Sequence, residues 1–215
     1  MRIGILGAGN MADALGAQWV RAGHDVRIGA RTPAKAAALA GRIGARSGSL
    51  TATAGFGDAT LVAVRYEGLP DLLGQVGGLL RGRTVLDCVN AVVPPGALLA
   101  TGDGPPVARL IAERTGANVV KAFNLCHDGV WRRRPPHFDG RPLVVPICGD
   151  DATALATARS LVSDLGCEPV DAGGLGRAGL LEAAAAFAIG LYIGGGDPRS
   201  VFPPAEYAGS ATGGS

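Results

Sequence analysis

A glycine-rich turn near the N-terminus constrains the fold of this chain more than any other sequence feature. The apolar segment 2–6 runs directly into Gly7-Ala8-Gly9-Asn10-Met11-Ala12, and a helical pattern then continues to residue 22. Glycines between a strand and a helix let the backbone approach a pyrophosphate at the positive helix end. We therefore expect a dinucleotide here, with Gly7 making the tight turn, Gly9 leaving room for the phosphates and Ala12 packing the helix on the strand. An ordinary turn is the alternative reading.

The next strand, 25–29, indicates which dinucleotide is bound. A ribose with a free 2′-hydroxyl requires an Asp or Glu at the end of this strand. The acid of this segment, Asp25, opens the strand, so at about 3.3 Å per residue it lies roughly 16 Å from the end that faces the ribose. We therefore expect that Asp25 does not bind the ribose.

The far end of that strand carries groups that suit a phosphate. It reads Ala30-Arg31-Thr32, with Lys35 one helical turn further on. A guanidinium, a hydroxyl and an ammonium favour a 2′-phosphate, so we expect NADP(H) as the cofactor. Alternatively, Thr32 only caps the next helix, and the two cations are solvated.

Composition narrows the class of protein. The chain has 215 residues, of which 47% are apolar and 18% charged, with a net charge of +2. This composition allows a large core and gives no sign of nucleic-acid binding. The four cysteines are scattered without metal-ligand spacing, so we expect reduced thiols, no metal and a cytoplasmic protein. Because the first expected strand starts at residue 2, we expect no signal peptide, and we expect the apolar run 183–193 to be too short to cross a membrane.

Strand-like and helix-like segments alternate along the chain, which predicts an α/β fold of the Rossmann type, a doubly wound and mostly parallel sheet with a small C-terminal extension. The expected strands are 2–6, 25–29, 60–66, 84–89, 118–123, 143–148 and 168–171, with a weak one at 48–53. The expected helices are 10–22, 33–41, 68–80, 106–115, 151–165 and 176–192.

Three parts are expected along the chain. Residues 1–142 form the dinucleotide-binding domain, residues 143–207 form an α/β extension that packs on it, and residues 208–215 form a disordered tail. The extension is expected to contribute to the acceptor cleft and the dimer interface.

The predicted helix 176–192 is apolar on almost every side, so we expect it to be buried all round. In a chain of this size a partner subunit is the expected cover, which predicts a homodimer through this helix. Glu182 is a carboxylate on this otherwise apolar surface. We expect Glu182 to pair structurally with a base such as Arg177 rather than to act in catalysis.

Ligands of doubly wound sheets lie beyond the carboxyl ends of the strands, which selects the candidate site residues. Besides the residues named above, Val64, Arg65, Asn90 and Ala91 are expected to bind the cofactor. Asn124, His127 and Tyr66 are the candidate catalytic residues, with His127 as a proton donor. Asn90 and Asn124 could equally be turn residues, and His127 a surface histidine.

A basic cluster and a missing signature bear on the second substrate. Arg132, Arg133, Arg134 and Arg141 lie in a long loop and could grip an anionic substrate or simply be solvated. The chain shows neither a nucleophile elbow nor a K-x-x-x-N or Y-x-x-x-K dehydrogenase signature. A hydride acceptor that is itself a redox cofactor would suit such a site.

Most of the chain resembles the NADPH-dependent F420 reductases, the F420H2:NADP oxidoreductase family, which is related in its dinucleotide half to the STEAP ferric reductases. The resemblance is carried by GILGAGNMADAL at 4–15, VRIGAR at 26–31, VLDCVN at 85–90, VVKAFN at 119–124, VPICGDD at 145–151 and EPVDAGGLGRAGLLE at 168–182. It implies hydride transfer between NADP(H) and the deazaflavin coenzyme F420, with Asn90 and Asn124 lining the place where the two rings stack.

The chain departs from the family pattern on the acceptor side. Val64-Arg65-Tyr66-Glu67 stands where a proline-containing turn is usual, and Val89-Asn90-Ala91 replaces the usual T-N-P. Two alternatives therefore stay open. One is an NADPH- or F420H2-dependent reductase of an imine, enone or dehydroamino acid, which would need His127, Tyr66 or Glu67 as a proton donor. The other is a non-catalytic NADP-sensing module.

Overall fold

A single eight-stranded sheet organises the protein, as seen in a computed structural model that describes residues 1–94, 96–198 and 201. The strand order is β12-β11-β8-β5-β4-β1-β2-β3, and all pairs are parallel except β8 with β11. The strands are β1 Arg2–Leu6, β2 Asp25–Gly29, β3 Arg46–Gly48, β4 Ala59–Val62, β5 Thr84–Asp87, β8 Asn118–Lys121, β11 Val144–Gly149 and β12 Glu168–Asp171.

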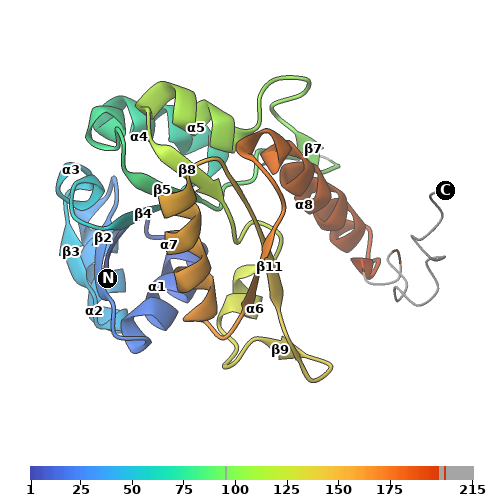
Figure 1. Cartoon of the computed structure of the whole chain (residues 1–215), viewed down its shortest axis with the longest axis horizontal. Coiled ribbons are helices and arrows are strands. Elements are labelled where there is room, and N and C mark those ends of the chain that lie inside the picture. The colour runs from blue at the N-terminus through green and yellow to red at the C-terminus, as the bar shows by residue number, and fades with distance from the viewer. Residues whose placement is uncertain (95, 199–200, 202–215) are drawn as a thin grey trace.

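Helices cover both faces of the sheet, with α1 and α7 on one side and α4 and α5 on the other (Figure 1). The helices are α1 Asn10–Arg21, α2 Pro33–Ile43, α3 Leu50–Ala54, α4 Leu69–Val76, α5 Val107–Thr115, α6 Asp128–Trp131, α7 Ala152–Ser163 and α8 Ala178–Ile193. Neighbouring residues of a strand face opposite layers. In β4, Leu61 belongs to the core under α1, and Val62 to the core under α4. The predicted doubly wound fold is confirmed.

The elements differ from the predicted ones mainly at their ends. β4 ends at Val62 instead of 66, because the chain leaves the sheet there and forms the 3-10 turn η1 Tyr66–Gly68. The predicted helix 68–80 is shorter, since α4 gives way to the 3-10 turn η2 Gly77–Leu79.

The strand expected at 48–53 is wrong. Only β3 is extended there, and the side chain of Ser49 then accepts a hydrogen bond from the Ala52 backbone, which starts α3. Thr53 of this helix is fully buried. A Cβ on Gly4 would lie 2.4 Å from the carbonyl oxygen of Thr53, so the close approach of α3 to the sheet needs glycine there.

The C-terminal segment continues the same sheet. β11 pairs antiparallel with β8, and β12 extends the sheet beyond it. Two of the connecting segments contain small hairpins, formed by β6 Val92–Val93 with β7 Leu98–Leu99, and by β9 His137–Phe138 with β10 Arg141–Pro142. The predicted tail, 208–215, lies outside the described residues.

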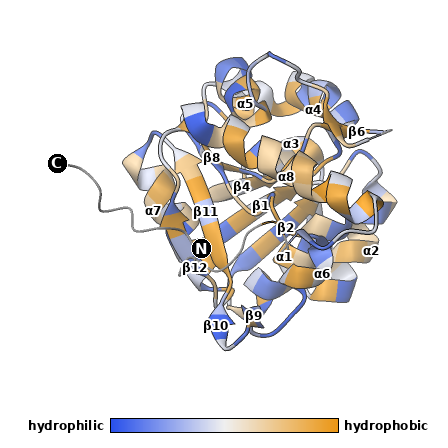
Figure 2. Cartoon of the chain, turned by 90° about the vertical axis from the view of Figure 1, so that its right-hand side faces the viewer, coloured by the Kyte–Doolittle hydropathy of each residue, from blue (hydrophilic) through white to orange (hydrophobic). Residues whose placement is uncertain are grey.

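Helix α8 has one covered face and one open face. Ala178, Glu182, Ala185 and Ala186 are buried, whereas the side chains of Leu180, Phe187, Tyr192 and Ile193 are exposed. Figure 2 shows this helix in mostly hydrophobic colours. The single chain therefore covers only part of this helix, and its expected cover by a partner subunit stays a prediction. The span Leu175–Ile193 is also long and apolar enough, by length and composition alone, to cross a membrane, contrary to the expectation from the shorter run.

Candidate functional site

A cleft of about 910 Å³ lies at the carboxyl ends of β1, β2, β4 and β5, where the strand order changes direction. Nearly all the residues predicted to bind the cofactor line it: Gly7, Ala8, Gly9, Asn10, Met11, Ala30, Arg31, Thr32, Lys35, Val64, Arg65 and Asn90. Ala12 and Ala91 do not line it, because both are fully buried in the core behind its wall.

The glycine turn meets two separate steric requirements. Gly7 has φ 133°, and a Cβ there would lie 2.1 Å from the carbonyl oxygen of Ala63, so this glycine lets the turn pass close to the end of β4. A Cβ on Gly9 would meet nothing within 4 Å. Gly9 instead caps α1, where the first helical hydrogen bond runs from the Asp13 N–H to the Gly9 carbonyl. The N–H groups before it lack helical partners and can receive an anion.

The end of β2 presents unpaired polar groups to the cleft. Thr32 caps α2, but its hydroxyl makes no capping hydrogen bond. Arg31 and Lys35 are exposed and form no ion pair within the described residues. Asp25 lies at the opposite end of the strand and pairs with Arg46, as its position predicted.

The opposite end of the cleft is formed by Cys88, Val89 and Asn90. Cys88 and Val89 directly follow β5, at a strand end that the ligand rule selects, but they were not among the residues predicted to bind the cofactor. The Cys88 thiol donates a hydrogen bond to the Val62 carbonyl at 3.3 Å, and burial raises its pKa to about 12. It therefore keeps its proton over the physiological range.

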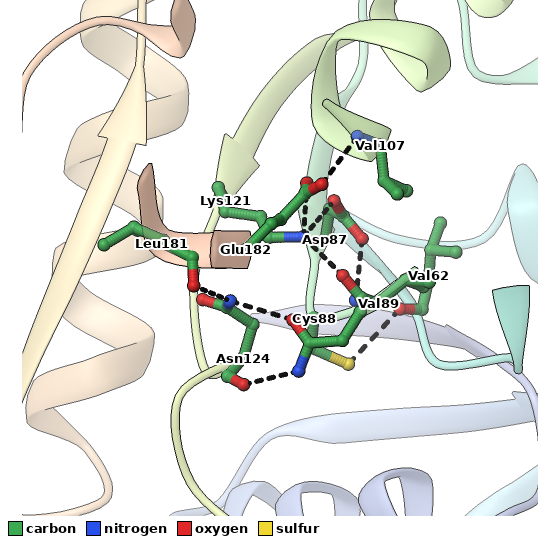
Figure 3. Close-up of polar contacts among 10 residues, drawn as sticks. Val62, Asp87, Cys88, Val89, Val107, Lys121, Asn124, Leu181 and Glu182 are labelled. Atoms are coloured by element: carbon green, nitrogen blue, oxygen red, sulfur yellow. Dashed lines mark hydrogen bonds and ion pairs between the residues drawn. The ribbon is translucent and has the colours of Figure 1, made fainter. Parts of the chain in front are cut away.

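Two asparagines that are 34 residues apart in the chain bond to each other at this end. The Asn90 amide donates to the Asn124 carbonyl at 2.7 Å, and the Asn124 amide donates to the Asn90 side chain at 3.0 Å. The Asn124 amide also donates to the Leu181 carbonyl at 3.0 Å, as Figure 3 shows. We call these residues the asparagine pair. Asn90 lines the cleft, and Asn124 lies behind it, 5% exposed.

Beneath this end lies a cluster of three buried charges that sequence reasoning did not assemble. Lys121 is fully buried, and its Nζ lies 2.9 Å from a carboxylate oxygen of Asp87 and 2.9 Å from one of Glu182 (Figure 3). We call Asp87, Lys121 and Glu182 the buried charge cluster. Glu182 is thus paired structurally, as expected, but its partner is Lys121. Arg177, the predicted partner, donates instead to the Ala172 carbonyl.

The two carboxylates keep Lys121 charged. Burial by itself lowers the pKa of Lys121, but the charges of Asp87 and Glu182 and their hydrogen bonds outweigh it, so the pKa stands above its ordinary value. Lys121 and Asp87 belong to the KAFN and VLDCVN motifs of the sequence, but only the fold brings the two side chains together.

The candidate catalytic residues His127 and Tyr66 do not line the cleft. The side chain of His127 is 83% exposed, and its Nδ1 accepts a hydrogen bond from the Gly129 N–H at the start of α6. Tyr66 is half-buried against the α4 layer and does not line the cleft. Glu67 and Asp71, by contrast, do line it.

Two arginines of the basic cluster make contacts within the protein. Arg132 forms ion pairs with Asp13 at 2.7 Å and with Asp128 at 3.2 Å, which fastens α6 to α1. The guanidinium of Arg133 lies 5.3 Å from the centre of the Phe138 ring. Arg132 is therefore committed to packing, and none of the four arginines lines the cleft.

The chain is similar to several known proteins. Residues 2–91 match the model of the family described as NADP oxidoreductase coenzyme F420-dependent. The chain is 29% identical over 185 residues to the metalloreductase STEAP3 of Rattus norvegicus, and the match covers 85% of this chain and 36% of the relative. The chain thus spans about a third of that curated relative.

Two solved structures have the same fold over most of their length. A hypothetical protein of Sinorhizobium meliloti has a TM-score of 0.72 and 29% identity, covering 81% of this chain and 85% of that one. A proposed F420-dependent NADP reductase of Arthrobacter sp. FB24 has a TM-score of 0.77 and 21% identity, covering 92% of this chain and 96% of that one.

These findings show a Rossmann-type fold whose residues 2–91 are similar to a family described as NADP oxidoreductases. The expected resemblance to the F420-dependent NADP oxidoreductases is confirmed over residues 2–91, which contain the glycine turn and the end of β2.

Proposed function

We propose that this protein transfers a hydride between NADP(H) and coenzyme F420. The observation that carries the proposal is the contrast within one cleft between unpaired anion-binding groups at one end and mutually bonded asparagines at the other. The match of residues 2–91 to a family described as coenzyme F420-dependent supports F420 as the second substrate.

The residues of the first end fit NADP(H). The space beside Gly9 and the unpaired N–H groups that open α1 suit the pyrophosphate. Arg31, Lys35 and the unused hydroxyl of Thr32 suit the 2′-phosphate. Arg65 adds a third cation to the cleft wall.

The second end suits an acceptor that depends on alignment. NADPH, when bound, supplies the hydride. The wall here offers the amide of Asn90 and a thiol whose pKa is raised to about 12, and neither readily gives up a proton. A redox cofactor fits such a wall, because holding two rings face to face supplies most of the catalysis.

Glu67 favours a second candidate function, the reduction of a small organic substrate such as an imine, enone or dehydroamino acid. That reaction needs a proton donor, and Glu67 is a carboxyl group that lines the cleft, unlike His127 and Tyr66. Under this candidate, Glu67→Gln lowers kcat strongly. Under the first, it has little effect.

The open face of α8 supports a homodimer, in which a second copy covers Leu180 and Phe187. Sedimentation at several concentrations tests this homodimer, and a monomer throughout would contradict it.

The composition suggests a cytoplasmic location and no nucleic-acid partner. The enzyme would then work on soluble cofactors.

Mixing the pure protein with NADPH and oxidised F420 tests the main proposal. We expect the visible absorption band of the deazaflavin to bleach as hydride is transferred, and the band to return when NADP⁺ is added to reduced F420. Tight NADPH binding without bleaching would overturn F420 as the acceptor and favour the organic-substrate reductase. An Arg31→Ala control should slow bleaching mainly by raising the KM for NADPH.

A further inference from the structure

The buried charge cluster holds the wall of the cleft by its backbone. The ammonium of Lys121 donates a hydrogen bond to the Val89 carbonyl, and the second carboxylate oxygen of Asp87 accepts from the Val89 N–H at 2.8 Å. Both the backbone N–H and the backbone carbonyl of Val89 are thus bound to the cluster. Because Val89 lies between Cys88 and Asn90 in the cleft wall, the cluster sets the position of the surface that a bound ring would meet.

The same cluster anchors α8. One oxygen of Glu182 pairs with Lys121, and the other accepts a hydrogen bond at 3.1 Å from the N–H of Val107, the first residue of α5. The preceding residue, Leu181, accepts the hydrogen bond from Asn124. Two consecutive residues of α8 are therefore fastened, one to the cluster and one to the asparagine pair (Figure 3).

Stability alone is a weak reason for such a cluster. Replacing a buried ion pair by apolar residues of the same shape is often neutral or stabilising, because two charges lose their water. What charges with matched hydrogen bonds add is a defined geometry. Here each carboxylate has a backbone N–H partner as well as the ammonium: Val89 in the cleft wall for Asp87, and Val107 at the start of α5 for Glu182.

We propose that Lys121, held by Asp87 and Glu182, is a positioning residue for hydride transfer: it fixes the Cys88–Asn90 wall against the nicotinamide ring and couples that wall to α8. This inference rests on the proposed binding of NADP(H) in the cleft. Lys121 does not line the cleft and acts only through Val89. The coupling means that a change in the packing of α8 alters hydride transfer.

The test uses Glu182→Gln, which keeps the side-chain shape and the acceptor for Val107 but removes one charge from the cluster. We expect NADPH affinity to change little, because the phosphate-binding groups lie at the other end of the cleft. We expect kcat with F420 to fall roughly 10- to 100-fold, the effect of a small misplacement of reacting groups. The kinetic isotope effect with NADPH deuterated at C4 should also become more temperature-dependent.

The matched control is Leu161→Ala, which removes a fully buried side chain of α7 in the opposite layer. It should lower thermal stability while leaving kcat and the isotope effect at the wild-type values. If Glu182→Gln lowers stability in the same way and leaves kcat and the isotope effect unchanged, the positioning role is overturned. Lys121→Met removes the shared cation of the cluster and should lower kcat further. If Lys121→Met does not fold, the result for Glu182→Gln alone decides whether the positioning role holds.

A readout that needs no acceptor separates this inference from the proposed function. The fluorescence emission of bound NADPH reports the surroundings of its nicotinamide ring. We expect Glu182→Gln to change that emission at saturation, and Leu161→Ala to leave it unchanged. A wild-type protein that fails to reduce F420 would overturn the acceptor, but an altered emission in Glu182→Gln would still support the positioning role. An emission unchanged from wild type would contradict it.

Discussion

The two ends of the cleft are built in opposite ways. The end at Gly7 and Arg31 uses backbone N–H groups and side chains that have no partner among the described residues and so remain available to a ligand. The end at Asn90 uses groups already bonded to one another, supported by the fully buried charge cluster. An end that binds phosphates needs unsatisfied groups, whereas an end that aligns a ring needs a rigid wall.

The largest expected effect on stability comes from removing the cation of the buried charge cluster, at the rigid end of the cleft. Lys121→Met leaves two carboxylates buried without their cation, so we expect the free energy of unfolding to fall by roughly 3 to 5 kcal/mol. Urea denaturation measures the loss. Adding Asp87→Asn and Glu182→Gln to this variant should recover part of it, since no unpaired charge then stays buried. A Lys121→Met protein as stable as the wild type would show that the buried ion pairs contribute little to stability.

The cluster also predicts a pH dependence with a defined sign. The pKa of Lys121 is raised in the folded protein. Its contribution to stability is therefore complete below the unfolded value of about 10.4 and is lost as the pH rises through the folded value. Wild-type protein should lose stability in that alkaline range more steeply than the triple variant does, as measured by urea denaturation at each pH.

The glycine turn gives the next largest effect and separates folding from binding at the open end. Gly7→Ala places a Cβ against the Ala63 carbonyl at a positive φ, so we expect a loss of at least about 2 kcal/mol in stability. Gly9→Ala meets no protein atom within 4 Å, so stability should stay within about 0.5 kcal/mol of the wild type. NADPH affinity should nevertheless fall roughly tenfold or more, because the methyl group occupies the phosphate space.

Thermal unfolding and NADPH titration of the two glycine variants provide the measurements. The pair is its own control, since each variant adds the same methyl group two residues apart. Full NADPH affinity in a stable Gly9→Ala protein would argue against phosphate binding at this turn.

Arg31→Ala tests whether the open end of the cleft binds the 2′-phosphate. We expect NADPH binding to weaken by roughly 1.5 to 3 kcal/mol, the usual cost of losing a hydrogen bond to a charged group. NADH lacks that phosphate, so its affinity should barely change. Titration of both dinucleotides checks the prediction, and equal weakening of the two would mean that Arg31 does not contact the phosphate.

The smallest effect is expected at His127, the predicted proton donor that the structure places outside the cleft. Its exposed side chain caps the short helix α6, so His127→Ala should change stability by no more than about 1 kcal/mol. Its kcat should stay within roughly threefold of the wild type, below the usual contribution of an acid–base group. Steady-state kinetics decides, and a much larger loss would return His127 to the catalytic residues.

Sequence patterns predicted most of the fold and one end of the cleft. Strand and helix periodicity, the glycine turn and the position of Arg31 are local, because each depends on residues within about one βαβ unit. Predictions failed where local pattern was ambiguous. The segment 48–53 alternates weakly, and a Ser49 cap turns most of it into a helix.

By itself, the sequence determined the doubly wound sheet and the glycine turn, and it predicted NADP(H) as the cofactor, because hydrophobic period and turn chemistry act over short stretches of chain. Only the tertiary structure decided the other end of the cleft. Asp87, Lys121 and Glu182 come from β5, β8 and α8, and Asn90 meets Asn124 across 34 residues. Whether a charged side chain is paired, buried or exposed depends on which distant elements pack beside it, and no local pattern specifies that packing.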